Sequence, residues 1–224
     1  MPTKTGLKKL DSLLSGGFPD NSVVLLSGGP GTGKTLIGLK FLLEGAIKGE
    51  KCCFVTLNEN KEEILRACES VKSLKHINDY VDKNLAIECI QMGQSNVTMK
   101  RFIDIISNYP KIDRIVIDNV NKLLLFSENV KSYRAYLIEL INTLKGIKSS
   151  LLLCETNNDE VVDSGCNESF ECDGVIQLIF LDLEEKPMRA LMIHKMRYTS
   201  FAPKLPHELV IDNNDVRLTE TKVI

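Results

Sequence analysis

The stretch VVLLSGGPGTGKTLIGLKFLL, residues 23–43, decides the fold of this chain. Its centre, Gly28 to Thr35, fits the phosphate-loop pattern of a glycine, four residues, Gly-Lys and a hydroxyl residue. An apolar run typical of a strand precedes this centre, and a run with helical spacing follows it. The succession of strand, glycine-rich loop and helix is the context in which this pattern binds phosphate groups.

The chemistry of phosphate binding explains the residue types of the loop. A helix N-terminus offers unpaired N–H groups and a positive dipole end, and glycines let the backbone approach a phosphate closely because they lack a Cβ. Lys34 is expected to reach the β and γ phosphates, and the Thr35 hydroxyl to hold Mg²⁺. The residues predicted to bind the nucleotide are Gly28, Gly29, Pro30, Gly31, Thr32, Gly33, Lys34 and Thr35.

The composition is that of an ordinary globular protein, with 43% hydrophobic and 26% charged residues. The length of 224 residues fits one domain, and a net charge of -2 gives no drive toward nucleic acid or an anionic membrane. The N-terminus lacks the apolar core of a secretion signal, and no apolar run approaches the length of a membrane helix. We therefore predict a cytoplasmic protein without a membrane partner.

The seven cysteines are scattered along the chain without a Cys-x-x-Cys pair. The apolar runs around Cys52, Cys53, Cys89 and Cys154 predict buried strands, where a thiol behaves as a small hydrophobic group. Cys166 and Cys172 share a loop, so their spacing also allows oxidation or metal binding. Free thiols in a reducing compartment are nevertheless the favoured interpretation.

Strand-like runs alternate with segments of helical spacing over most of the chain. Because such alternation buries both faces of a sheet, we predict an α/β fold with a RecA-like, mostly parallel central sheet, helices on both faces and a C-terminal antiparallel extension. One domain is expected over residues 1–224, with a lead-in at 1–22, a nucleotide-binding core at 23–181 and a β meander at 182–224. The predicted strands are Val23–Ser27, Cys52–Leu57, Leu85–Gln91, Arg114–Asp118, Leu151–Thr156, Gly174–Leu181, Arg189–Met196, Leu205–Ile211 and Val216–Leu218, and the predicted helices include Leu36–Ile47, Glu62–Leu74 and Tyr133–Leu144.

Two of the predicted strands lead into a carboxylate. Asp118 closes a branched aliphatic run, and since the carboxyl ends of parallel strands meet at the ligand crevice, it is expected to hold Mg²⁺ directly or through water. Glu59 follows the second strand, where a carboxylate could orient or deprotonate the attacking water. The spacing equally allows Asn58 to cap the next helix, with Glu59 as an acid in its first turn.

Lys195 and Arg197 close a later apolar strand, and their spacing directs both side chains to one face. In an isolated domain such a pair usually forms a solvated face or an acidic contact. In a ring of protomers it can reach the γ-phosphate on a neighbouring subunit, as an arginine finger does. Between Lys148 and Lys186 the chain has many acidic residues and no Lys or Arg, so this segment would repel a nucleic acid strand.

Taken together, these motifs resemble a single KaiC-type domain of the RecA superfamily of phosphate-loop ATPases. The resemblance covers nearly the whole chain, and its more diagnostic parts are Asp173-Gly174-Val175-Ile176 and Lys195-Met196-Arg197. It implies ATP and Mg²⁺ as ligands and a hexameric ring with ATP between protomers. In such a ring Lys195 and Arg197 would act on the nucleotide of the neighbour.

Two departures restrict what this resemblance implies. Members similar to the clock protein of the family carry two consecutive glutamates after the second strand, where this chain has Asn58 and Glu59. Asparagine can position a water but cannot accept its proton, so hydrolysis is expected to be slow unless Glu59 takes over. The Ser-Thr pair phosphorylated in the clock protein falls near Ser169-Phe170, which leaves one hydroxyl for a weak autokinase activity and gives no support for a clock function.

Three functions remain open at this point. The first is an Mg-dependent ATP-binding protein and slow ATPase that forms a ring, and the second is a nucleotide-gated assembly or regulatory module with negligible hydrolysis, which Asn58 favours. The third, a RadA-type DNA recombinase, is opposed by the acidic segment and the near-neutral charge. The residues assigned to the first function are Lys34, Glu59, Lys195 and Arg197 for catalysis, and Thr35 and Asp118 for the metal.

Overall fold

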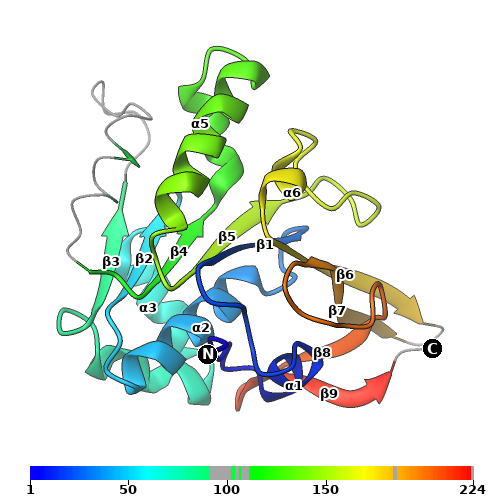
Figure 1. Ribbon diagram of the computed structural model, residues 1–224. Coiled ribbons are helices and arrows are strands. Elements are labelled where there is room, and N and C mark those ends of the chain that lie inside the picture. The colour runs from blue at the N-terminus through cyan, green and yellow to red at the C-terminus, as the bar shows by residue number, and fades with distance from the viewer. Residues whose placement is uncertain (91–101, 104–105, 107–110, 184–185, 223–224) are drawn as a thin grey trace.

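The computed structural model describes residues 1–224 except 91–101, 104–105, 107–110, 184–185 and 223–224. The described residues form a nine-stranded sheet with helices on both faces (Figure 1). The strand order is β3-β2-β4-β5-β1-β6-β7-β8-β9, so β1, the strand that leads into the phosphate loop, lies in the interior of the sheet. This architecture confirms the predicted α/β fold, while the predicted domain boundaries stay a prediction.

The strands from β3 to β6 in this order run parallel, and β7, β8 and β9 run antiparallel to their neighbours. β1, β2 and β4 are buried along their whole length, which explains why their sequences are nearly continuous apolar runs. The strands are β1 (Ser22–Gly28), β2 (Cys52–Thr56), β3 (Leu85–Cys89), β4 (Arg114–Asp118), β5 (Ser149–Glu155), β6 (Gly174–Leu183), β7 (Lys186–Met196), β8 (His207–Ile211) and β9 (Val216–Lys222).

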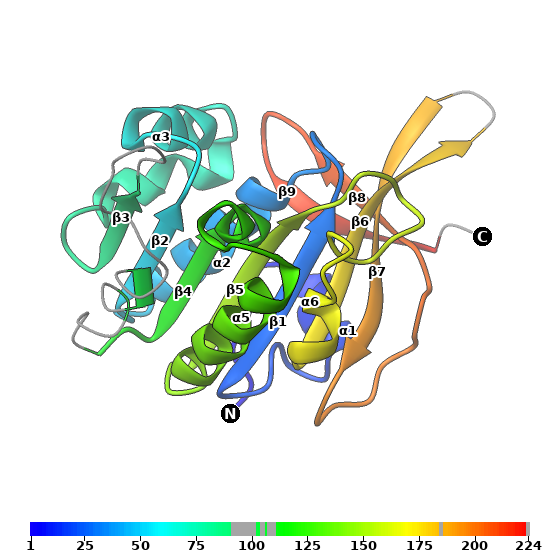
Figure 2. The ribbon, with the colours of Figure 1, turned by 90° about the horizontal axis from the view of Figure 1, so that it is seen from above.

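Helices cover both faces of the sheet. α5 and α6 lie on one face, and α1, α2 and α3 lie on the other, as two perpendicular views show (Figures 1 and 2). The helices are α1 (Lys8–Leu13), α2 (Lys34–Ile47), α3 (Lys61–Glu69), α5 (Val130–Leu144) and α6 (Glu168–Glu171), with 3-10 helices η1 (Lys72–Asp79) and η2 (Val120–Phe126). Among the described residues, none of these helices combines the length and apolar character needed to span a bilayer.

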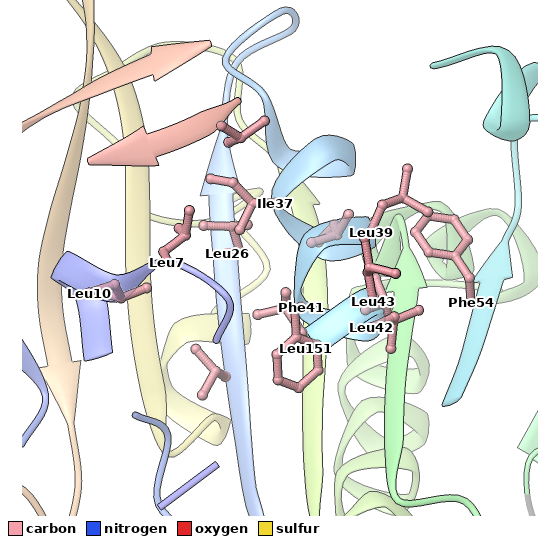
Figure 3. Packing of buried hydrophobic residues seen from close by; sticks show 14 of the residues in the cluster. Leu7, Leu10, Leu26, Ile37, Leu39, Phe41, Leu42, Leu43, Phe54 and Leu151 are labelled. Carbon is pink, nitrogen blue, oxygen red and sulfur yellow. The ribbon is translucent and has the colours of Figure 1, made fainter. Parts of the chain in front are cut away.

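Alternate residues of the central strands face two separate hydrophobic cores. On β1, Leu26 belongs to the core shared with α2, whereas Leu25 belongs to the core shared with α5. Figure 3 shows Leu26 in one cluster with Ile37 and Phe41 of α2. These contacts hold α2 against the sheet, and they fix the position of its first turn directly after the phosphate loop.

Three details differ from the sequence prediction. The helix predicted over Glu62–Leu74 is interrupted after Glu69, because Val71 takes an extended conformation and is buried before η1 begins. Cys89, predicted to be buried, is exposed because β3 is the edge strand, whereas Cys52, Cys53 and Cys154 are buried as predicted. The lead-in, predicted as turns, contains α1, and the end predicted for β3 at Gln91 lies outside the described residues.

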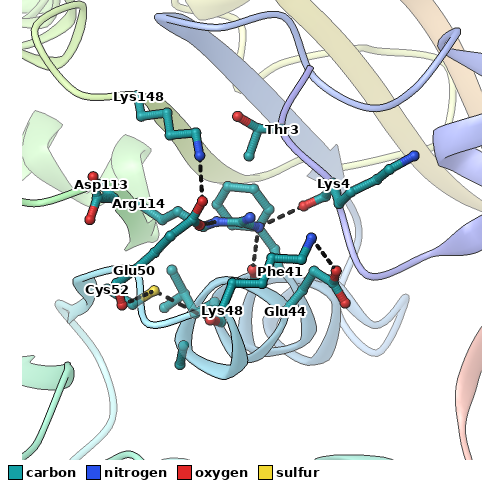
Figure 4. Close-up of polar contacts among 12 residues, drawn as sticks. Thr3, Lys4, Phe41, Glu44, Lys48, Glu50, Cys52, Asp113, Arg114 and Lys148 are labelled. Atoms are coloured by element: carbon teal, nitrogen blue, oxygen red, sulfur yellow. Dashed lines mark hydrogen bonds and ion pairs between the residues drawn. The ribbon is translucent and has the colours of Figure 1, made fainter. Parts of the chain in front are cut away.

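A buried arginine ties the N-terminal segment to the sheet (Figure 4). Arg114 at the start of β4 is 1% exposed and pairs with Glu50, which also pairs with Lys148. Its Nη1 donates to the carbonyls of Lys4 at 2.6 Å and Phe41 at 2.9 Å, and its guanidinium lies 4.8 Å from the Phe41 ring centroid. The charge is thus paired and hydrogen-bonded, which a buried arginine requires.

We expect Arg114→Ala to lower the free energy of unfolding by about 3–5 kcal/mol, because it removes the buried partner of Glu50 and the donor that serves the carbonyls of Lys4 and Phe41. Urea unfolding measures this loss. The matched control is Arg134→Ala, since Arg134 is half exposed and pairs with Glu171 at 3.3 Å, so its loss should cost under about 1 kcal/mol. If both variants lost the same free energy of unfolding, the network around Arg114 would not be a main source of stability.

Candidate functional site

The C-terminal ends of β1, β2, β4 and β5 lie side by side, because these strands are parallel neighbours in the sheet. There they bring together the phosphate loop after β1, Glu59 just after β2, and Asp118 at the end of β4. The parallel register explains this convergence, since Gly28 pairs with Glu155 and Thr56 pairs with Asp118. A cleft of about 500 Å³ opens at these strand ends.

Two side chains of the phosphate loop donate hydrogen bonds to its own backbone. The ammonium of Lys34 donates to the carbonyls of Gly28 at 2.8 Å and Gly29 at 2.7 Å. The Thr32 hydroxyl is buried and also donates to the Gly29 carbonyl, at 2.8 Å, so its role in this structure is to shape the loop. Gly33 takes a positive φ of 104° at the N-cap of α2, a conformation that favours glycine.

The two residues predicted to bind Mg²⁺ lie in direct contact. Thr35 Oγ1 donates to Asp118 Oδ2 at 2.7 Å, although the two residues are far apart in the chain. Burial raises the pKa of Asp118 above its ordinary value, and this hydrogen bond and the nearby Lys34 ammonium act in the opposite sense. A hydroxyl and a carboxylate oxygen side by side fit the oxygen ligands that Mg²⁺ prefers, and most of its other ligands are commonly waters and phosphates.

Glu59 lines the same cleft and takes no part in capping the next helix. Thr56 Oγ1 accepts the N–H groups of Asn58 at 3.2 Å and Glu59 at 3.0 Å, which holds the turn after β2. The cap of α3 is Asn60, in a capping box with Glu63, so the alternative with Asn58 as the cap and Glu59 in the first turn is wrong. Burial, followed by the charges of Asp118 and Glu63, raises the pKa of Glu59.

The structure places Lys195 and Arg197 away from this cleft. Because β7 runs antiparallel to β6, Arg197 lies beside Asp173 and level with Val23, at the opposite end of β1 from Gly28. Five residues of strand span about 16 Å, beyond the reach of an arginine side chain. Arg197 Nη1 donates to Asp173 Oδ1 at 3.0 Å, so neither cation can serve the nucleotide cleft of its own chain in this arrangement.

Lys195 contacts α6. Its ammonium donates to the carbonyls of Ser169 at 3.1 Å and Phe170 at 3.2 Å. Burial and the neighbouring Arg197 lower its pKa. Ser169 itself donates its hydroxyl to Asp163 Oδ2 at 2.6 Å, so the one hydroxyl predicted for autophosphorylation is held against a carboxylate.

The comparison with known proteins agrees with this geometry. A family model described as the KaiC ATPase matches residues 3–223. The chain belongs to the KaiC family of ATPase domains. The KaiC-like protein PH0186 from the hyperthermophilic archaeon Pyrococcus horikoshii has a similar structure, with a TM-score of 0.82 and 29% identity, and the match covers 98% of this chain and 99% of that one.

Curated relatives of this KaiC-family chain include UPF0273 proteins of archaea. The one from Saccharolobus solfataricus is 27% identical over 227 residues, which cover 95% of this chain and 81% of the relative. The one from Methanopyrus kandleri is 27% identical over 237 residues, which cover 98% of this chain and 92% of the relative. The resemblance inferred from the motifs is therefore confirmed.

Outside the phosphate loop and α2, sequence reasoning missed four residues that line the cleft of this KaiC-family domain: Lys122, Glu155, Arg189 and Ile211. Glu155 could have been found, since Leu151–Glu155 is an apolar run that ends in a carboxylate, as the run before Asp118 does. Arg189 and Ile211 carry no such signal, because they come from β7 and β8, whose place beside the loop depends on the sheet order. Lys122 lies in η2, where no motif marks it.

We expect Gly33→Ala to destabilise the protein by about 1–2 kcal/mol, because alanine is strained at this positive φ. The new Cβ would also lie 2.3 Å from Ile211 Cδ1, but that side chain can move. Adding Ile211→Ala should therefore not restore stability. Thermal unfolding tests this, with Gly29→Ala as the control, since no atom lies within 4 Å of its added Cβ.

Proposed function

We propose that this KaiC-family domain binds Mg-ATP and hydrolyses it slowly, in a ring with nucleotide between protomers. The observation that carries the proposal is the contact between Thr35 and Asp118 beside the Lys34 ammonium, in one cleft with the phosphate loop. Gly28 to Thr35 would hold the phosphates, and Thr35 and Asp118 the metal. Glu59 would orient the attacking water and accept its proton.

The position of Lys195 and Arg197 supports their proposed action in trans. They cannot reach the cleft of their own chain, and Arg197 is exposed at the opposite end of β1. A second copy that presents this end to the cleft would bring both cations to the γ-phosphate, as an arginine finger does. The hexamer and the cytoplasmic location stay predictions from the resemblance and the composition.

A second candidate function is a nucleotide-gated assembly module with negligible hydrolysis. Asn58, in the cleft, supports it, because an amide cannot take the proton of the attacking water. The raised pKa of Glu59 supports hydrolysis instead, since a carboxylate whose pKa is closer to neutrality is a better proton acceptor. We place slow hydrolysis first for this reason.

We expect Lys34→Ala to abolish Mg-ATP binding, because it removes the buried ammonium that both closes the loop and pairs with the phosphates. Calorimetry measures the affinity, and light scattering with and without Mg-ATP measures the particle mass. Lys48→Ala is the matched control, since Lys48 follows the other end of α2 and pairs with Glu44. Unchanged affinity and unchanged particle mass in Lys34→Ala would refute the proposal. If the wild type stays a monomer in saturating Mg-ATP, only the proposed ring is refuted.

We expect phosphate release to fall as the pH drops through the pKa of Glu59, because only the carboxylate form accepts a proton. Since that pKa is raised, the fall should begin above the ordinary glutamate value of about 4.3. The Glu59→Gln variant should lose this pH dependence, and its rate of phosphate release should be at least tenfold lower than that of the wild type. A Glu59→Gln variant with an unchanged rate would contradict the assignment of this residue as the base.

We expect Asn58→Glu to raise the rate of phosphate release if the missing carboxylate limits hydrolysis. Asn58→Gln is the control, because it adds the same length without a charge. A single-turnover assay with bound Mg-ATP separates the chemical step from nucleotide binding. Equal rates in both variants and the wild type would count against the account in which the missing carboxylate at position 58 limits hydrolysis.

A further inference from the structure

Glu155 is a carboxylate of the cleft to which the proposed function gives no role. It ends β5, pairs with Gly28 in the parallel ladder, and lines the same cleft as the phosphate loop. Its backbone N–H donates to Asn121 Oδ1 at 3.0 Å, which fixes the end of the strand. Its side chain is exposed and makes no hydrogen bond or ion pair within the described part of the chain. The carboxylate is therefore held in place and available to a ligand.

Strand alternation places the side chain of Glu155 on the same face of the sheet as that of Asp118. Leu153, two residues before Glu155, packs in the core shared with α2. Val116, two residues before Asp118, packs in the same core. Because side chains two positions apart on a strand point to one face, both carboxylates lie on the face that α2 covers. Thr35 lies on this face as well, in the first turn of α2.

The register of β4 and β5 sets the spacing of the two carboxylates. Asp118 pairs with Leu153, so Glu155 lies two residues farther along the neighbouring strand. With strands about 4.8 Å apart and a rise of about 3.3 Å per residue, the two backbone positions are about 8 Å apart. This spacing leaves room between the side chains for one hydrated ion. Mg²⁺ keeps several of its waters in proteins and is usually bound by one or two carboxylates together with phosphates.

The charge of Glu155 acts on the groups at the centre of the cleft. Burial lowers the pKa of Lys34, and Glu155 is the first of the neighbouring charges that act in the opposite sense, ahead of Asp118. Burial also raises the pKa of Asp118, and the charge of Glu155 adds to this increase, because two close carboxylates resist ionising together. A divalent cation between them would relieve this repulsion, whereas a polyphosphate without a metal would add to it.

We propose that Glu155 is a second carboxylate of the metal site, and that it accepts hydrogen bonds from water carried by the metal of a bound nucleotide. The proposal rests on the proposed function and extends the metal-binding set beyond Thr35 and Asp118. The carboxylate attracts the divalent cation and repels a polyphosphate that lacks one. Glu155 thus determines specificity, because it selects the metal complex of a nucleoside polyphosphate over the metal-free form.

The affinity of the full chain for ATP with and without Mg²⁺ tests this assignment. Calorimetry in excess Mg²⁺ and in excess EDTA gives two affinities, and their ratio measures the coupling between metal and nucleotide. We expect Glu155→Gln to lower this ratio about tenfold, because Mg-ATP binds more weakly and metal-free ATP more tightly than to the wild type. Glu155→Asp, which keeps the charge on a shorter side chain, should keep part of the ratio.

Mn²⁺ gives a second readout that does not involve hydrolysis. The spin resonance signal of free Mn²⁺ measures the affinity of the ion for the protein saturated with a non-hydrolysable ATP analogue. We expect Glu155→Gln to lower this affinity by a factor similar to the fall in the calorimetric ratio, because the metal and the nucleotide affect each other reciprocally.

Glu139→Gln is the matched control, since it removes one carboxylate from the exposed side of α5. It should leave both readouts unchanged. Urea unfolding confirms that each variant is folded, and Glu155→Asp serves if Glu155→Gln is not. A wild-type ratio and a wild-type Mn²⁺ affinity in folded Glu155→Gln would overturn the role of Glu155 alone.

Two further outcomes would overturn the metal role in other ways. Equal weakening of ATP binding with and without Mg²⁺ would mean that Glu155 only supports the shape of the cleft. A slower single turnover with an unchanged ratio would mean that it accepts the proton of the attacking water instead. Failure of the wild type to bind Mg-ATP at all would overturn the proposed function, and this assignment with it.

Discussion

The ammonium of Lys34 connects the phosphate loop to the strand that precedes it and to the helix that follows. It donates to two carbonyls of the loop, and the Gly28 carbonyl also accepts the N–H of Thr156 beyond β5. Burial lowers the pKa of Lys34, while the charges of Glu155 and Asp118 act in the opposite sense. The neighbouring carboxylates thus stabilise a buried cation that a polyphosphate would stabilise further.

The two ends of β1 carry different chemistry. At its carboxyl end the phosphate loop, Thr35 and Asp118 line the cleft that we propose for a metal and phosphates. At its amino end the Val23 N–H donates to Asp173, whose carboxylate also pairs with Arg197. One strand therefore supports both the cleft and the proposed finger, and the 16 Å or so between them keeps the finger out of the cleft of its own chain.

The antiparallel extension contributes to the cleft as well as to the sheet. β7 brings Arg189 to the loop, and β8 brings Ile211 against Gly33. The hairpin between β8 and β9 is tied to α2 through Lys40 and Asp215. Part of the rim of the cleft therefore consists of residues that follow the phosphate loop by more than 150 positions. With them, the cleft is lined by as many cationic as acidic side chains.

The sequence by itself determined the local chemistry, because a phosphate loop needs glycines, a lysine and a hydroxyl in consecutive order. It also determined the sheet class and the carboxylate at Asp118, since both follow from short apolar runs and their ends. Only the tertiary structure decided that Asn60 caps α3, that Glu155 and Arg189 reach the cleft, and that Arg197 lies far from it. Those facts depend on strand order and direction, which bring distant residues together and which no local pattern encodes.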